Sequence, residues 1–142
     1  MGLGVRGKTH LRAMQKNPGR YDIVGLCDID VAKMKKVAED FGVADVPQFT
    51  SAEEMLDKTR PDVFVFVTYP DLRLNMIELA VKYGVKAVSL EKPMAESLGE
   101  AKAMRDLCAE NGIKAVVCHQ QKYLSQMQAM KERIDDGEIG KV

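Results

Sequence analysis

The chain has 142 residues, and its 21 Lys and Arg residues balance 21 Asp and Glu residues. This length suits one domain with a hydrophobic core. The zero net charge argues against a nucleic-acid partner, and no apolar run approaches the roughly 18 to 20 residues of a membrane span.

The chain opens with a glycine-rich turn of the form Gly-x-Gly-x-x-Gly at residues 2–7. A helix with Leu11 and Met14 on one side follows directly. Such a turn normally comes after a β-strand, and here only one residue precedes it. We therefore expect the first and central strand to lie upstream of Gly2, or to be supplied by another chain.

Short apolar strands then alternate with amphipathic helices. Strands are expected at 21–27, 62–67, 85–90 and 113–118. Each helix between them should begin at a capping residue and bury one apolar stripe. The predicted caps are Asp30, Ser51 and Ser97, and the predicted stripes are Met34, Val37, Ala38 and Phe41; Leu72, Met76, Leu79, Ala80 and Tyr83; Ala101, Met104, Leu107 and Cys108; and, in a final helix, Met127, Met130 and Ile134.

This alternation predicts an α/β fold with a Rossmann-like, doubly wound parallel sheet that carries helices on both faces and lacks its first strand. Most of the nine methionines lie on the apolar stripes, so we expect them to fill the core. We treat residues 1–142 as one nucleotide-binding domain.

The strand at 21–27 is followed by Asp28, 21 residues beyond Gly7. A dinucleotide-binding turn has an acidic residue about 20 residues after its third glycine. Gly2 would permit the tight turn, Gly4 would let the backbone approach a pyrophosphate, and Gly7 would allow close packing of helix on strand. The N-terminus of the helix favours an anion.

Asp28 would then accept hydrogen bonds from the adenosine ribose hydroxyls. Its charge should repel the 2′-phosphate of NADP, and Ile29 and Asp30 offer no arginine to hold that phosphate. The sequence therefore favours NAD over NADP. The alternative is that Asp28 is a simple turn or cap residue, although Asp30 suits the cap better.

The cysteines Cys27, Cys108 and Cys118 show no Cys-x-x-Cys spacing, and neither His10 nor His119 pairs with them at ligand spacing. The sequence therefore predicts reduced, partly buried thiols in a cytoplasmic protein, and no metal site.

Polar groups follow three of the expected strands, at residues 67–71, 90–93 and 118–123. Ligands of an open parallel sheet bind at these carboxyl ends. Together with the glycine turn, the motifs resemble those of the Gfo/Idh/MocA family, which includes glucose–fructose oxidoreductase and inositol dehydrogenase. The most specific motif is Glu91-Lys92-Pro93 after a strand. The resemblance covers the whole chain but only the nucleotide-binding half of the family.

The resemblance implies that Lys92 is catalytic and touches the reacting hydroxyl or carbonyl oxygen. A lysine held extended by the following proline can polarise a carbonyl. From the residues alone, a surface lysine paired with Glu91 is an equal alternative. The implied cofactor-binding residues are Gly2, Leu3, Gly4, Val5, Arg6, Gly7, Asp28, Thr68, Tyr69, Glu91, Lys92 and Gln120.

The chain departs from the family pattern at two places. Arg73 stands where the family often has histidine, and Lys122-Tyr123 replaces the usual Arg-Phe. We expect His10 to be structural and His119 to be a packing or supporting residue rather than a base.

The resemblance implies an NAD(P)-dependent oxidoreductase that transfers a hydride between nicotinamide and a sugar, polyol or related hydroxyl compound. Two alternatives stay open: an NAD-dependent glycoside hydrolase, and a non-catalytic dinucleotide-binding regulator. A substrate domain is expected after residue 142, reached through residues 137–142, and the full-length protein is expected to form a homo-oligomer.

Overall fold

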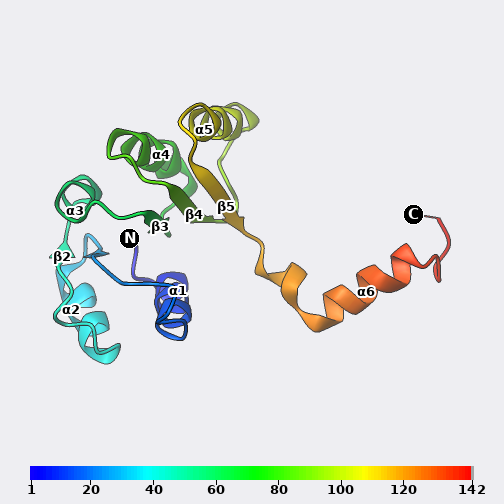
Figure 1. The fold of residues 1–142 in the computed structure, drawn as a ribbon, viewed down its shortest axis with the longest axis horizontal. Helices are drawn as coiled ribbons and strands as arrows, with labels where there is room; N and C mark the ends of the chain where they lie inside the picture. Colours follow the sequence, from blue (N-terminus) through cyan, green and yellow to red (C-terminus); the bar gives the residue numbers. More distant parts are fainter. Residues whose placement is uncertain (142) are drawn as a thin grey trace.

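The computed structural model describes residues 1–141 and has the expected α/β architecture (Figure 1). Residue 142, the last of the expected passage at 137–142, lies outside the described residues. In chain order the elements are α1 (Val5–Gln15), β1 (Leu26–Cys27), α2 (Val31–Asp40), β2 (Gln48–Phe49), α3 (Ala52–Thr59), β3 (Val63–Phe66), the 3-10 turn η1 (Pro70–Leu72), α4 (Arg73–Lys82), β4 (Ala87–Glu91), α5 (Leu98–Glu110), β5 (Lys114–Cys118), the 3-10 turn η2 (Gln120–Tyr123) and α6 (Ser125–Asp135).

All strand pairs are parallel. β1 pairs with β2, and β3, β4 and β5 form a second sheet in that order, with Phe66 opposite Leu90. Parallel neighbours need crossover connections, and the helices between the strands supply them. The predicted parallel, Rossmann-like arrangement is therefore confirmed.

Met1 and Gly2 lie between the two sheets. Gly2 N donates to Cys27 O at 2.8 Å, and Val67 N donates to Met1 O at 2.9 Å. The Met1 amino group also donates to Val65 O at 2.7 Å. These two residues therefore hold the position of a central strand's carboxyl end, between β1 and β3.

The expected strand at 21–27 is shorter than predicted, because only Leu26–Cys27 has strand structure. Residues 21–25 could form strand hydrogen bonds only with a neighbouring strand that lies ahead of Met1. A cavity of about 110 Å³ lies beside them, and its lining includes Ile23, Phe64 and Val65. Among residues 1–141, only Met1 and Gly2 lie between β1 and β3 at this place.

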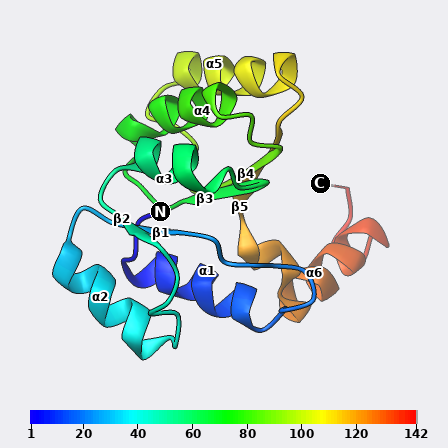
Figure 2. The same cartoon turned by 60° about the vertical axis from the view of Figure 1, so that its left-hand side comes forward.

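Helices lie on both sides of the larger sheet, but the second side stays partly open, with Val63 44% and Val116 58% exposed (Figure 2). Helices α3, α4 and α5 lie on one side, and α1 lies on the other (Figure 2). One core cluster fills the first layer, around Phe64, Phe66 and Leu90. A second cluster joins α1 to α2 through Leu11 and Met34. The glycine turn before α1 is therefore held between the two clusters, with Met1 packed against the first and Leu3 within the second.

The predicted helix caps are confirmed. The Asp30 side chain accepts from Lys33 N, the Ser51 side chain from Glu54 N, and the Ser97 side chain from Glu100 N. Each bond satisfies one of the free N–H groups at a helix start.

One residue of the predicted α4 stripe and the whole predicted α6 stripe are exposed instead of buried. Leu72 precedes α4 and is 46% exposed, whereas the neighbouring Arg73 is 3% exposed. The residues of α6 are all exposed, including Met127, Met130 and Ile134, so these side chains do not fill a core. Figure 1 shows α6 extending away from the sheet, and no other described element covers its apolar side. Periodicity alone does not reveal whether a helix face has a partner.

Across residues 1–141, no helix combines the length and the apolar character needed to cross a membrane. The three cysteines are free thiols, with Cys27 and Cys108 buried and Cys118 partly buried, as predicted.

Candidate functional site

The glycine turn forms a tight connection from the strand position at Met1 into α1. Gly2 has a φ of +79°, and a Cβ there would lie 2.5 Å from Val67 O. A Cβ on Gly7 would lie 1.8 Å from Gly2 O. Only glycine lets the turn and the first helical turn approach each other so closely. The expected tight turn and close packing are both observed.

Gly4 is different, because a Cβ there would meet nothing within 4 Å. The side of the turn above Gly4 is therefore open. Gly4 is also the N-cap of α1 and has no side chain to cap it, and the first bond back to its carbonyl comes from Lys8 N at 3.0 Å. An open space at an uncapped helix N-terminus suits an anion, and a dinucleotide pyrophosphate fits this position.

Asp28 follows β1 and is 5% exposed. Its Oδ2 accepts from Leu3 N at 2.7 Å, and its Oδ1 accepts from Asp30 N at 3.0 Å. Lys33 Nζ also lies 2.9 Å from Oδ1. Burial by itself raises the pKa of Asp28, but the bonds from Asp30, Lys33 and Leu3 outweigh it and hold the pKa below its usual value. The carboxylate is therefore ionised and faces the glycine turn.

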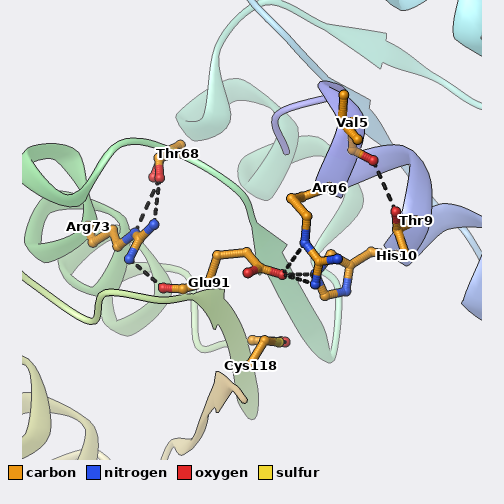
Figure 3. A network of polar contacts seen from close by, with 9 residues as sticks. Val5, Arg6, Thr9, His10, Thr68, Arg73, Glu91 and Cys118 are labelled. Atoms are coloured by element: carbon orange, nitrogen blue, oxygen red, sulfur yellow. Dashed lines mark hydrogen bonds and ion pairs between the residues drawn. The ribbon is translucent and has the colours of Figure 1, made fainter. Parts of the chain in front are cut away.

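Glu91, at the end of β4, is buried and lies among side chains from α1 (Figure 3). Its Oε1 accepts from Arg6 Nη2 at 2.9 Å and lies 2.9 Å from His10 Nε2. Burial by itself raises the pKa of Glu91, but the hydrogen bonds from His10 and Arg6 have the larger effect and hold the pKa below its usual value. The ion pair fixes the glycine-turn helix against the carboxyl end of β4.

His10 therefore does more than support its helix, since it contacts a predicted cofactor-binding residue. The ionised Glu91 carboxylate can only accept, so the His10 Nε2 carries the proton in this contact. Sequence spacing gives no sign of the contact, because His10 and Glu91 are 81 residues apart.

Arg73 joins the loops that follow β3 and β4. Its Nε and Nη2 donate to Thr68 O at 3.2 and 2.8 Å, and its Nη1 donates to Glu91 O. Desolvation lowers the pKa of Arg73, against the opposing charge of Glu91. Arg73 thus places a buried guanidinium fork between two site loops (Figure 3).

Thr68 has an unused hydroxyl. Within residues 1–141, its Oγ1 is the one buried side-chain N or O atom that has no hydrogen-bond partner. An orphaned buried polar atom carries a free-energy cost unless a ligand or water satisfies it. This observation supports a bound group at the loop after β3.

The other predicted site residues lie at the surface. Lys92 is exposed, and no ion pair with Glu91 occurs among the described residues, so the surface-pair alternative is not observed. Tyr69 is 80% exposed. Gln120 and His119 are exposed just beyond β5. These side chains border the carboxyl ends of β3, β4 and β5, the edge where parallel sheets bind ligands.

The structure also brings together side chains that sequence spacing keeps apart. His10, Glu91 and Cys118 offer nitrogen, oxygen and sulfur atoms that all lie within 4.8 Å of one another. The Cys118 sulfur is 3.3 Å from Ser89 Oγ. Arg6 also pairs with the Glu91 carboxylate, and these groups form a polar cluster between α1 and the carboxyl ends of β4 and β5.

Comparison with known proteins gives a consistent result. The chain matches the Gfo/Idh/MocA family, an oxidoreductase family with an NAD-binding Rossmann fold, over residues 1–119. It is 29% identical over 140 residues to D-apiose dehydrogenase of Paraburkholderia graminis, covering 99% of this chain and 36% of that protein. It is 28% identical over 141 residues to scyllo-inositol 2-dehydrogenase (NAD(+)) of Bacillus subtilis, covering 99% of this chain and 40% of that protein.

Among solved structures, the WlbA dehydrogenase of Bordetella pertussis, in complex with NADH and UDP-GlcNAcA, is similar with a TM-score of 0.86 and 26% identity. The similarity covers 96% of this chain and 40% of that one. The chain thus spans about two fifths of the length of these relatives. The matched family, the parallel fold and the glycine turn with its acidic partner agree: the chain belongs to the Gfo/Idh/MocA family of oxidoreductases with an NAD-binding Rossmann fold.

Proposed function

We propose that this chain is the cofactor-binding domain of an NAD-dependent dehydrogenase that acts on a sugar, polyol or related hydroxyl compound. The observation that carries the proposal is the open N-terminus of α1 at Gly4, beside the buried carboxylate of Asp28. The relatives named as apiose and inositol dehydrogenases support the substrate class. The three free thiols support a cytoplasmic location. A homo-oligomeric full-length protein remains a prediction from the family resemblance.

The bound dinucleotide would supply the carbon that accepts or gives up the hydride. The backbone N–H groups of Val5, Arg6 and Gly7 would hold the pyrophosphate, and Asp28 would hold the adenosine ribose. The Thr68 hydroxyl would form its missing hydrogen bond with the cofactor. The fold already holds each of these groups in place, so binding would cost little conformational entropy of the protein.

Lys92 would act on the substrate. Its ammonium would donate a hydrogen bond to the reacting oxygen, polarising a carbonyl or stabilising an alkoxide. The neighbouring Glu91 is held by Arg6, His10 and Arg73, so the backbone that carries Lys92 has a fixed starting point. Glu91 would thus anchor the loop, and Lys92 would act on the substrate.

Replacing Asp28 with alanine should weaken NADH binding by about 1–3 kcal/mol, because hydrogen bonds to a charged acceptor are lost. Fluorescence titration with NADH measures the change. Asp40→Ala is the matched control: it removes an exposed carboxylate at the far end of α2, paired with Lys36, and leaves NADH affinity unchanged. Equal NADH affinity in Asp28→Ala and the wild type would remove Asp28 from the site.

We also propose that the domain takes one further parallel strand, leading into Met1, and that a substrate domain follows residues 1–142. The cavity between residues 21–25 and β3 supports the first part. A strand there would pair with both neighbours and bury apolar side chains.

An extension of five β-branched apolar residues ahead of Met1 should raise the unfolding temperature by at least about 5 °C, because it adds a few kcal/mol of apolar burial and ladder pairing. Differential scanning calorimetry measures the shift. A Gly/Ser extension of equal length serves as the control. Equal unfolding temperatures for the two extensions would show that the cavity does not accept a strand.

A further inference from the structure

Asp28 shares the predicted ribose position with a lysine. Lys33, in the first turn of α2, places Nζ 2.9 Å from Asp28 Oδ1. The same carboxylate accepts from two backbone N–H groups, those of Asp30 and Leu3. A carboxylate has about four acceptor positions, and three are therefore in use. One remains for a ribose that offers two adjacent hydroxyls.

Lys33 is the donor that can leave. The Leu3 and Asp30 donors belong to the backbone and are fixed by the fold. The Lys33 side chain is 41% exposed, whereas the Asp28 side chain is 5% exposed. A lysine has a long, flexible stem, so its ammonium can swing about the ribose position while Asp28 stays in place.

Lys33 also changes the charge that a nucleotide would meet. Rejection of a 2′-phosphate depends on the negative charge of Asp28, and an ammonium at 2.9 Å compensates that charge. An ammonium is in addition a good point-charge partner for phosphate. The Asp30 carboxylate also attracts the Lys33 ammonium. Because the Asp30 carboxylate opposes a phosphate, the arrangement favours tolerance of both nucleotides over a strict choice of NADP.

We propose that Lys33 is a specificity-determining residue that allows the ribose site to accept NADP as well as NAD. The inference rests on the proposed function. With NAD, the Lys33 ammonium stays with Asp28 or donates to a ribose hydroxyl. With NADP, it turns from Asp28 to the 2′-phosphate.

The test compares Lys33→Ala with Lys36→Ala in the otherwise unchanged protein. Lys36 lies on the same helix and forms an exposed pair with Asp40, so it controls for general charge. NADH and NADPH are titrated separately by fluorescence at low and high salt. We expect Lys33→Ala to lose at least about tenfold in NADPH affinity and to change less than about threefold toward NADH. Lys36→Ala should change neither affinity, and salt should weaken wild-type binding of NADPH more than that of NADH.

The other outcomes separate this inference from the proposed function. Wild-type protein that binds NADH but not NADPH would overturn the role of Lys33 and leave the proposed function standing. Equal losses for both nucleotides in Lys33→Ala, or no loss for either, would also overturn it, since Lys33 would then support the fold alone or do nothing. Wild-type protein that binds neither nucleotide would overturn both proposals.

Discussion

Replacing Lys92 with alanine is expected to lower kcat for hydride transfer by about 10²- to 10⁴-fold, the usual contribution of a positioned proton-donating group. The ammonium is the one cationic group in the Glu91-Lys92-Pro93 motif, and its backbone follows a glutamate that three side chains hold in place. The measurement is steady-state reduction of NAD by the full-length protein with a panel of sugars and polyols. The Kd for NADH should change less than about threefold, because the loss falls on the transition state.

Lys86→Ala is the matched control for Lys92. Lys86 lies just before the other end of β4, is exposed, and pairs with Asp62 at 2.6 Å. Its loss removes an ion pair that is fully exposed to solvent and screened by it, so kcat should stay unchanged. If Lys92→Ala and Lys86→Ala have the same kcat, Lys92 is a surface lysine and the proposed chemistry is wrong.

Substitutions at two glycines of the turn are expected to have different effects, one on folding and the other on cofactor binding. Gly7→Ala places a Cβ 1.8 Å from Gly2 O, a contact with backbone that only a shift of the turn can relieve. We expect it to lower the free energy of unfolding by more than about 3 kcal/mol, beyond the usual cost of an extra methyl group in a packed site. Urea unfolding followed by circular dichroism measures the loss.

Gly4→Ala should have a much smaller effect on stability. Its φ of −67° suits any residue and a Cβ there meets nothing within 4 Å, so the cost should be no more than about 1 kcal/mol, because alanine is a poorer N-cap than glycine. The Cβ would instead occupy the approach of the pyrophosphate, and NADH affinity should fall by at least about tenfold. A stable Gly4→Ala protein with wild-type NADH affinity would show that the pyrophosphate does not cross this turn.

Local signals allowed much of the fold to be predicted. Asp30, Ser51 and Ser97 cap the helices that follow them, as their side chains and spacing indicate. The apolar run at 62–67 contains β3, which lies in a parallel sheet with Phe64 and Phe66 buried on one face and Val63 exposed on the other. The spacing of Gly7 and Asp28 brings a carboxylate to the turn, where it accepts from Leu3 N.

The remaining features depend on long-range contacts that periodicity does not describe. Leu72 fits a buried stripe, yet Arg73 occupies the buried position, because its guanidinium can satisfy the carbonyls of Thr68 and Glu91. β1 is limited to Leu26–Cys27, the two residues that pair with β2. The contact of His10 with Glu91 joins elements separated by most of the chain. The contact of Lys33 with Asp28 has no signature in the sequence, because it depends on how the loop after β1 leads into the first turn of α2.

The most direct test of the central claim is the set of backbone amide resonances that move when NADH is added to the ¹⁵N-labelled protein. The account predicts that shifts concentrate in residues 2–8, at Asp28 and its neighbours, and at Thr68 and Tyr69, with the amides of α5 unaffected. Shifts confined to α5 and the start of β5, or no shifts at saturating NADH, would contradict a cofactor site at the glycine turn.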